Sequence, residues 1–183
     1  MIRVMSVLIM ELPLLCVTLS SAGMAEPQCH SSERYHVAAL AHADDTGNRF
    51  AVTRLDGPAP AACLFDETKA DFVIGKAGDP LWYGELAGDS LILSRSTGPE
   101  GDLVVYDLRT GKPILDAPSD DYEREGDRLS FWERGERATA ETCPEFAENE
   151  ANGLGSVMAD LRVLDLKTGA VSETGESKCV AVQ

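Results

Sequence analysis

The stretch Asp102-Leu-Val-Val-Tyr-Asp-Leu-Arg-Thr-Gly111 recurs as Asp160-Leu-Arg-Val-Leu-Asp-Leu-Lys-Thr-Gly169, with seven of ten positions identical. In the first copy Leu103 and Val105 alternate with Val104 and Tyr106, so a strand here would bury both of its faces. An aspartate at the end of a strand can accept bonds from turn amides, and glycine adopts a positive φ without steric cost. Each copy therefore predicts an interior strand that ends in a tight turn.

The repeat extends beyond these ten residues. Gly88-Asp89-Ser90-Leu91 precedes the first copy and Gly126-Asp127-Arg128-Leu129 precedes the second, while Phe50-Ala-Val-Thr-Arg-Leu-Asp-Gly57 is a fainter third copy. Each unit predicts one strand, a Gly-Asp turn, a second strand, and a Thr-Gly turn into a third strand.

Short apolar or alternating stretches continue along the chain, with turn signals about every ten residues, which is the spacing of an antiparallel all-β domain. We expect strand or short apolar segments at Tyr35 to His42, Arg49 to Leu55, Leu64-Phe65, Phe72 to Ile74, Leu81 to Leu86, Ser90 to Arg95, Leu103 to Tyr106, Arg128 to Glu133, Leu161 to Leu166 and Lys178 to Val182. The sequence thus predicts an antiparallel meander that forms a compact β-sandwich or barrel.

The repeated phrase resembles the blade repeats of β-propellers, in which a strand ending in an Asp-x-x-Thr-Gly turn recurs once per blade. This resemblance implies an alternative fold, a small or incomplete β-propeller-like array. Three units are fewer than the four or more blades that close a propeller.

Residues 1–25 have the pattern of an export signal. Arg3 supplies the positive start, Val4 to Leu19 is mainly apolar, and the small residues before Ala25 suit a signal peptidase. Cleavage after Ala25 would leave residues 26–183 as a single all-β domain in the periplasm or the secreted fraction. The apolar run is short and contains Glu11 and Pro13, so we expect no stable membrane insertion after cleavage.

Four cysteines follow this segment: Cys29, Cys63, Cys143 and Cys179. In an exported chain an even set of cysteines predicts disulfides. Four cysteines allow three pairings, of which we favour the local one, Cys29 with Cys63 and Cys143 with Cys179.

The chain has 31 acidic against 16 basic residues and a formal net charge of −15. Such a surface repels nucleic acid and attracts basic proteins and cations. Ca²⁺ is the one cofactor that the composition suggests, at Asp116 to Asp127 or at the turn from Asp44 to Asn48. The first stretch does not fit the EF-hand spacing, a solvated turn is the simpler interpretation of each stretch, and we expect no other metal site.

A segment over residues 137–159 interrupts the last unit of the chain, the one that ends in the copy at Asp160–Gly169. This segment contains Cys143. Long insertions in compact domains are often functional loops, although an insertion without a role is an equal alternative. Its candidate binding residues are Glu145, Glu148, Asn152, Gly153 and Leu154. Trp82 and Trp132 form a second candidate, an aromatic surface, if they face solvent instead of the core.

Gly88-Asp89-Ser90-Leu91 also resembles the motif of the GDSL esterases, whose nucleophilic serine needs a histidine base near the C-terminus. The histidines here are His30, His36 and His42, and none follows Ser90. At a spacing of six residues on one strand they would also lie too far apart to share a metal. We therefore expect a hairpin turn at Ser90 and no catalytic residues.

These features together predict an exported, non-catalytic binding or interaction protein. One concrete form is an inhibitor of a basic enzyme such as a lysozyme, with a basic protein as the partner. The alternatives are a carboxylate-based hydrolase, because 31 acidic residues make close carboxylate pairs inevitable, and a structural component of the cell envelope.

Overall fold

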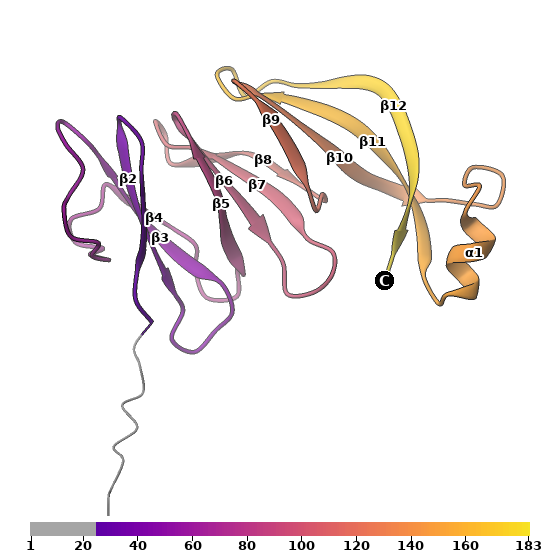
Figure 1. Cartoon of the computed structure of the whole chain (residues 1–183), viewed down its shortest axis with the longest axis horizontal. Coiled ribbons are helices and arrows are strands. Elements are labelled where there is room, and N and C mark those ends of the chain that lie inside the picture. The colour runs from indigo at the N-terminus through magenta and orange to yellow at the C-terminus, as the bar shows by residue number, and fades with distance from the viewer. Residues whose placement is uncertain (1–24) are drawn as a thin grey trace, which may run out of the picture.

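The computed structural model describes residues 25–183, so the expected signal peptide lies outside the described residues except for Ala25. The fold consists of three four-stranded antiparallel sheets, each a meander in chain order (Figure 1). The strands of the first sheet are β1 (Gln28–Ser31), β2 (Tyr35–Ala41), β3 (Asn48–Arg54) and β4 (Phe72–Ile74). Those of the second are β5 (Leu81–Ala87), β6 (Ser90–Arg95), β7 (Asp102–Asp107) and β8 (Lys112–Ala117). Those of the third are β9 (Tyr122–Glu125), β10 (Arg128–Arg137), β11 (Gly155–Asp165) and β12 (Val171–Val182), with helix α1 (Phe146–Ala151) between β10 and β11.

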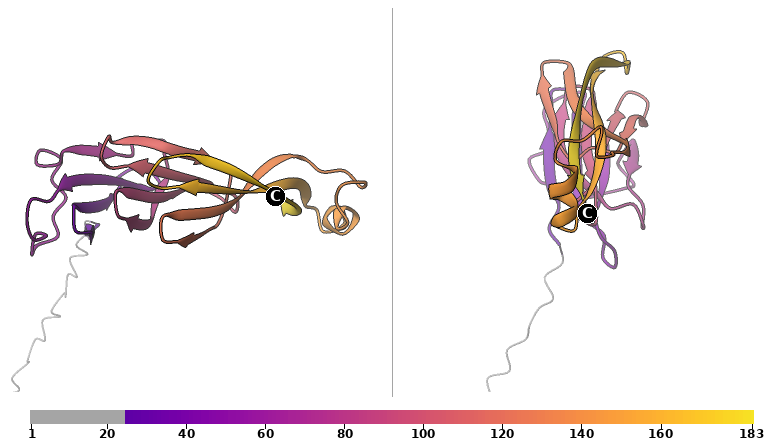
Figure 2. Two further views of the ribbon diagram at one scale, coloured as in Figure 1. Left: turned by 90° about the horizontal axis from the view of Figure 1, so that it is seen from above. Right: turned by 90° about the vertical axis from the view of Figure 1, so that its right-hand side faces the viewer.

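The three sheets follow one another along the long axis of the molecule, with their faces packed together (Figures 1 and 2). The prediction of an antiparallel all-β fold is confirmed, and the stack is consistent with a β-sandwich. The expected barrel alternative is wrong for the described residues. Hydrogen bonding stops at the edges of each meander, and the chain passes to a new sheet instead of closing the old one. The three consecutive four-stranded units form a row that is open at both ends (Figure 1).

Two hydrophobic cores hold the stack together, and the second sheet contributes to both. Leu93 and Val104 join the core shared with the first sheet, while Ile92 and Val105 join the core shared with the third. The alternation along Asp102 to Asp107 therefore marks an interior strand, as predicted, with Leu103 and Val105 on the opposite face from Val104.

The three sequence units are equivalent in structure. The residue after the third strand of each sheet donates its backbone N–H to the turn that precedes the second strand. These bonds run from Leu55 to the carbonyl of Arg34 at 2.8 Å, from Leu108 to Asp89 at 2.7 Å and from Leu166 to Asp127 at 2.8 Å. The fainter copy at Phe50 to Gly57 is thus a true third unit.

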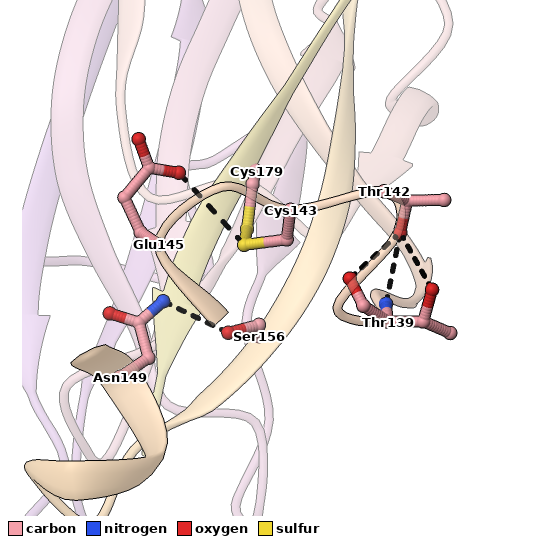
Figure 3. Close-up of a disulfide and its surroundings, with 7 residues drawn as sticks. All are labelled: Thr139, Thr142, Cys143, Glu145, Asn149, Ser156 and Cys179. Atoms are coloured by element: carbon pink, nitrogen blue, oxygen red, sulfur yellow. Dashed lines mark hydrogen bonds between the residues drawn. A yellow bond between two sulfur atoms is a disulfide. The ribbon is translucent and has the colours of Figure 1, made fainter. Parts of the chain in front are cut away.

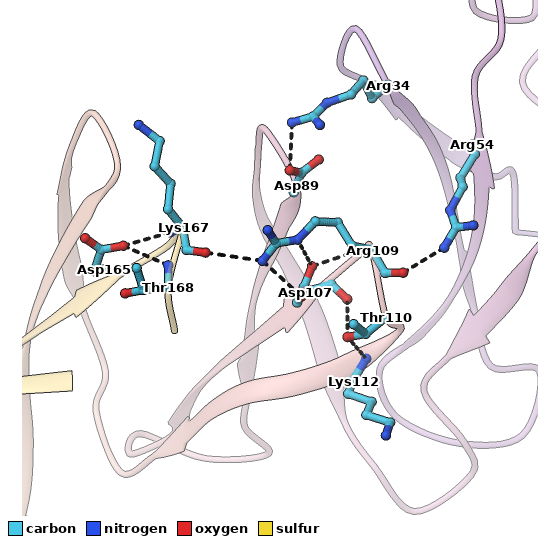
Figure 4. A network of polar contacts seen from close by, with 10 residues as sticks. All are labelled: Arg34, Arg54, Asp89, Asp107, Arg109, Thr110, Lys112, Asp165, Lys167 and Thr168. Atoms are coloured by element: carbon cyan, nitrogen blue, oxygen red, sulfur yellow. Dashed lines mark hydrogen bonds and ion pairs between the residues drawn. The ribbon is translucent and has the colours of Figure 1, made fainter. Parts of the chain in front are cut away.

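Polar contacts run from unit to unit along one edge of the stack (Figure 4). Arg54 Nη2 donates to the carbonyl of Arg109 at 2.8 Å, and Arg109 Nη2 donates to the carbonyl of Lys167 at 3.3 Å. Asp107 orients Arg109 through Nε at 2.9 Å and Nη2 at 3.1 Å. Arg54 and Arg109 therefore each bond a turn of the next sheet.

Both disulfides have the expected local pairing, Cys29 with Cys63 and Cys143 with Cys179, with Cα–Cα separations of 5.6 and 5.3 Å. They fit an oxidising compartment. Among residues 25–183, no helix has the length and apolar character needed to cross a membrane.

Candidate functional site

The connection between β10 and β11 projects from the end of the stack that carries the third sheet (Figure 1). We call residues 138–154 the acidic loop. Arg137 still belongs to β10 and residues 155–159 to β11, so the free part of the expected insertion is shorter than 137–159. Cys143 is 1% exposed and ties the loop to β12 through Cys179 (Figure 3).

Hydrogen bonds hold both halves of the acidic loop. In the first half Thr142 Oγ1 accepts from the backbone N–H of Thr139 at 2.9 Å, and the N–H of Cys143 reaches the Thr139 carbonyl at 3.0 Å. In the second half Asn149 of α1 donates from Nδ2 to Ser156 Oγ of β11 at 2.9 Å (Figure 3). Since Ser156 is only 4% exposed, this bond anchors the helix to the sheet.

The sequence of the acidic loop explains its exposure. Helix α1 buries none of its own residues. Four carboxylates of the loop face solvent: Glu141, Glu145, Glu148 and Glu150. Residues 138–154 include no lysine, arginine or histidine. The hydroxyl of Thr139 donates to Glu141 at 2.6 Å and lowers the pKa of that carboxyl. The loop is therefore an anionic projection at neutral pH.

The five candidate residues of this loop lie on and around α1. Glu145 is the N-cap of the helix, Glu148 is in its first turn and Asn152 is its C-cap. Gly153 follows with φ +76°, and the N–H of Leu154 returns to the carbonyl of Asn149 at 2.8 Å. The turn after α1 thus places these residues on one short, ordered projection.

The two tryptophans proposed as an aromatic surface lie on different sheets and have separate partners. Trp82 of β5 is 40% exposed and donates from Nε1 to the carbonyl of Ser96 at 2.9 Å. Trp132 of β10 lies under the ammonium of Lys178, which is 4.1 Å from the ring centroid. No contact joins the two rings within the described residues.

Some carboxylates of the acidic stretches considered for Ca²⁺ bond protein groups. Asp116 accepts from Arg95 at 2.7 and 3.0 Å, Asp120 pairs with Arg134, and Asp127 pairs with Lys167. In the other stretch, Asp45 accepts from the amides of Thr46 and Gly78 at 2.7 and 2.6 Å. These bonds occupy carboxylate oxygens that a Ca²⁺ site would use as ligands.

One group of three metal-ligand types, Cys143, Glu145 and Cys179, comes together within the described residues. The two sulfur atoms are joined in the disulfide and provide no thiolate for a metal. The contact therefore supports the fold of the acidic loop and not a metal centre.

Ser90 and the histidines lie in surroundings typical of residues that support the fold. Ser90 is 2% exposed at the start of β6, after the hairpin turn that the sequence predicted. His30 stacks on Tyr83 with ring centroids 3.5 Å apart, and burial together with the charge of His36 lowers the pKa of His30. Because β1 ends at Ser31 and β2 begins at Tyr35, the histidines do not share one strand.

A hollow at the opposite end of the molecule was not predicted. It lies between the outer face of the first sheet and residues 55–71, and it has a volume of about 260 Å³. Ala38 and Ala51 form part of its floor, directly opposite one another on β2 and β3. The only sequence feature that points to this hollow is the pair of small residues. The sequence alone does not show that they lie opposite one another, because that depends on the register of β2 and β3.

No family model matches the chain, and no curated protein or solved structure is similar enough to place it in a family.

Proposed function

We propose that the protein is exported to the periplasm or secreted, and that it binds a basic protein through the acidic loop. An inhibitor of a basic enzyme such as a lysozyme is the concrete form. The observation that carries this proposal is a tethered projection with four exposed carboxylates and no basic side chain between residues 138 and 154.

The charge of the loop supports association with a cationic partner. Carboxylates that converge on one projection attract a positively charged cleft over roughly one Debye length, about 8–10 Å at physiological salt. Such steering raises the association rate more than it slows dissociation.

The rigidity of the loop supports affinity. The disulfide, the bonds around Thr139 and the bond between Asn149 and Ser156 order the loop before any partner arrives. A preorganised loop loses less conformational entropy on binding than a flexible one. The shape also suits insertion, since the projection stands clear of the stack (Figure 2).

The test measures binding of the purified protein to a basic lysozyme, together with inhibition of that enzyme, at about 0.05 M and about 0.3 M salt. The triple variant Glu145→Gln, Glu148→Gln and Glu150→Gln removes three charges from the loop. The matched control Glu123→Gln, Glu125→Gln and Glu176→Gln removes three exposed charges elsewhere.

We expect the loop variant to bind at least about tenfold more weakly, with most of the loss in the association rate, and the control to stay within about twofold. High salt should weaken lysozyme binding by the wild type more than binding by the loop variant. Equal losses in the two variants would overturn the role of the loop. The absence of binding at about 10 µM protein would overturn the choice of lysozyme as partner.

A further inference from the structure

The hollow on the first sheet is built by a segment that we call the cap loop, residues 55–71. Cys63 joins this loop to Cys29 of β1, and Arg49 of β3 lies 5.0 Å from the ring centroid of Phe65. The end of the loop is bonded to β3, since the N–H of Asp71 donates to the carbonyl of Val52 at 2.8 Å. The cap loop is thus fixed to the sheet in its middle and at its C-terminal end.

The space beneath the cap loop is mainly apolar. Ala38 and Ala51 are 2% and 4% exposed, and their small side chains leave room where larger ones would fill the gap. Pro60, Ala62 and Leu64 of the cap loop form the opposite wall. Leu64 is 66% exposed, so an apolar side chain stands at the rim.

One wall carries hydrogen-bonding groups. His36 and Thr53 face each other across β2 and β3 and both line the hollow. Ser31 Oγ lies 2.8 Å from His36 Nδ1, which fixes the ring and leaves Nε2 for a ligand. Burial lowers the pKa of His36, so the imidazole is neutral at neutral pH.

The charged residues at this site compensate each other. Asp66 and Lys69 both line the hollow and are joined at 2.8 Å. A paired carboxylate and ammonium present little net charge to an entering molecule, so the site has no means to favour an ion over a neutral compound.

The volume sets the size of the ligand. An engineered apolar cavity of about 150 Å³ is known to bind benzene. At about 260 Å³ the hollow accommodates one ring with a short substituent, or a branched alkyl group of similar size.

We propose that the hollow under the cap loop binds a small neutral apolar molecule, about one ring in size, that carries a single hydrogen-bonding group directed at His36. This site is separate from the acidic loop and stands independently of the proposed protein-binding function.

The experiment uses three probes that share one ring: p-cresol, toluene, which lacks the hydroxyl group, and 4-methylbenzoate, which is charged. Binding is followed through the methyl NMR signals of Ala38, Ala51 and Leu64. We expect p-cresol to shift these signals. Toluene should bind about tenfold more weakly than p-cresol because it cannot form the hydrogen bond, and 4-methylbenzoate should bind most weakly of the three.

Variants test the location. Ala51→Leu fills the hollow and should reduce p-cresol affinity at least about tenfold. Ala43→Leu makes the same change in an exposed loop and should leave affinity unchanged. Leu64→Ser, at an exposed rim position where folding is not at risk, should weaken p-cresol and toluene alike, by about threefold.

The proposal is overturned if p-cresol fails to shift the Ala38 and Ala51 signals at millimolar concentration, or if Ala51→Leu and Leu64→Ser both bind it as tightly as the wild type. Binding of 4-methylbenzoate as tight as that of p-cresol would overturn the assignment of a neutral ligand. Because these probes do not involve the acidic loop, their failure leaves the lysozyme experiment unaffected.

Discussion

Asp107 orients Arg109, the residue whose guanidinium bonds the turn of the third sheet. Asp107 is 7% exposed, and its carboxylate accepts bonds from the backbone N–H and the guanidinium of Arg109. We expect Asp107→Asn to lower the free energy of unfolding by about 1–3 kcal/mol, because the guanidinium loses its charged acceptor. Urea denaturation measures this change.

The control for this variant is Asp165→Asn. Asp165 has the same turn position in the third sheet, where its carboxylate accepts from the amides of Lys167 and Thr168 at 2.9 Å. It is more exposed than Asp107, so a smaller loss is expected. A loss as large as that of Asp107→Asn would contradict the role assigned to Arg109.

Asp107 also gives the stability of the protein a pH dependence. Burial alone would raise its pKa, but the hydrogen bonds from Arg109 outweigh burial and hold the pKa below 3.8, its ordinary value. A carboxyl whose pKa is lowered by folding stabilises the fold above its unfolded pKa and loses that contribution as pH falls through the folded pKa. We expect the wild type to lose stability below about pH 4 more steeply than Asp107→Asn. Denaturation at several pH values gives the free energy of unfolding of both proteins. If this assignment were wrong, the plots of that free energy against pH would run parallel for the wild type and for Asp107→Asn.

Gly47 is required where the first sheet meets the second. It has φ +91°, and a Cβ there would lie 2.6 Å from Pro80 Cα and 2.7 Å from Leu81 N. Gly88 has φ +60° but open space around it. Gly88→Ala should cost about 1–2 kcal/mol from backbone strain, whereas Gly47→Ala should cost at least about 3 kcal/mol because backbone atoms must also move. Thermal unfolding compares the two variants, and equal melting temperatures would refute the close contact.

Among the elements, every interior strand was predicted, whereas the edge strands were predicted only in part: β4 has its expected bounds, Phe72–Ile74, but other edge strands were missed. Ser90–Arg95 was predicted with its observed bounds, since an interior strand is apolar on both faces. The missed strands, β1 and β9, both lie at sheet edges, and so does β8, which was expected only as the strand after the Thr-Gly turn, without bounds. β8 begins Lys112-Pro113 and β9 reads Tyr-Glu-Arg-Glu, which are polar sequences typical of protected edges. Leu64-Phe65 is apolar yet forms no strand, because it belongs to the cap loop.

The acidic loop was predicted from composition, but its helix was not. Helix α1 has six residues and buries none of them, so it shows no apolar periodicity. The hollow beneath the cap loop could not be predicted, because it depends on Ala38 pairing with Ala51 and on where a disulfide places a distant segment.

The disulfide at the acidic loop should control its order. We expect Cys143→Ser with Cys179→Ser to speed amide hydrogen exchange in residues 138–154 and to lower stability by about 3–5 kcal/mol in the chain-entropy model. The comparison is the double variant Cys29→Ser with Cys63→Ser. The two disulfides close loops of similar length, since the sequence separation is 34 for Cys29–Cys63 and 36 for Cys143–Cys179. This second pair should speed exchange in the cap loop instead. Unchanged exchange in α1 after loss of the first disulfide would show that the loop does not need its tether.

At the scale of the whole molecule, the second sheet joins two separate cores. Ile92 and Leu93 are neighbours, both 0% exposed, and they face the third and the first sheet respectively. Each change to alanine should cost about 2–5 kcal/mol. In a stack where each unit touches only its neighbours, stability is close to a sum of units and interfaces. Hydrogen exchange should therefore rise mainly in β10 for Ile92→Ala and mainly in β2 and β3 for Leu93→Ala. A uniform rise in both variants would mean that the three sheets unfold as one.

The contacts from turn to turn give the stack a direction. Arg54 bonds the turn of the second sheet and Arg109 that of the third, while Lys167, at the position of Arg109, pairs with Asp127 of its own sheet. If a copy of the second unit were spliced in after itself, Arg109 of the first copy would meet the same turn carbonyl on the second copy, but the two different faces of the second sheet would have to pack against each other. Lengthening the protein by tandem duplication therefore requires a new apolar interface as well as a repeated turn contact.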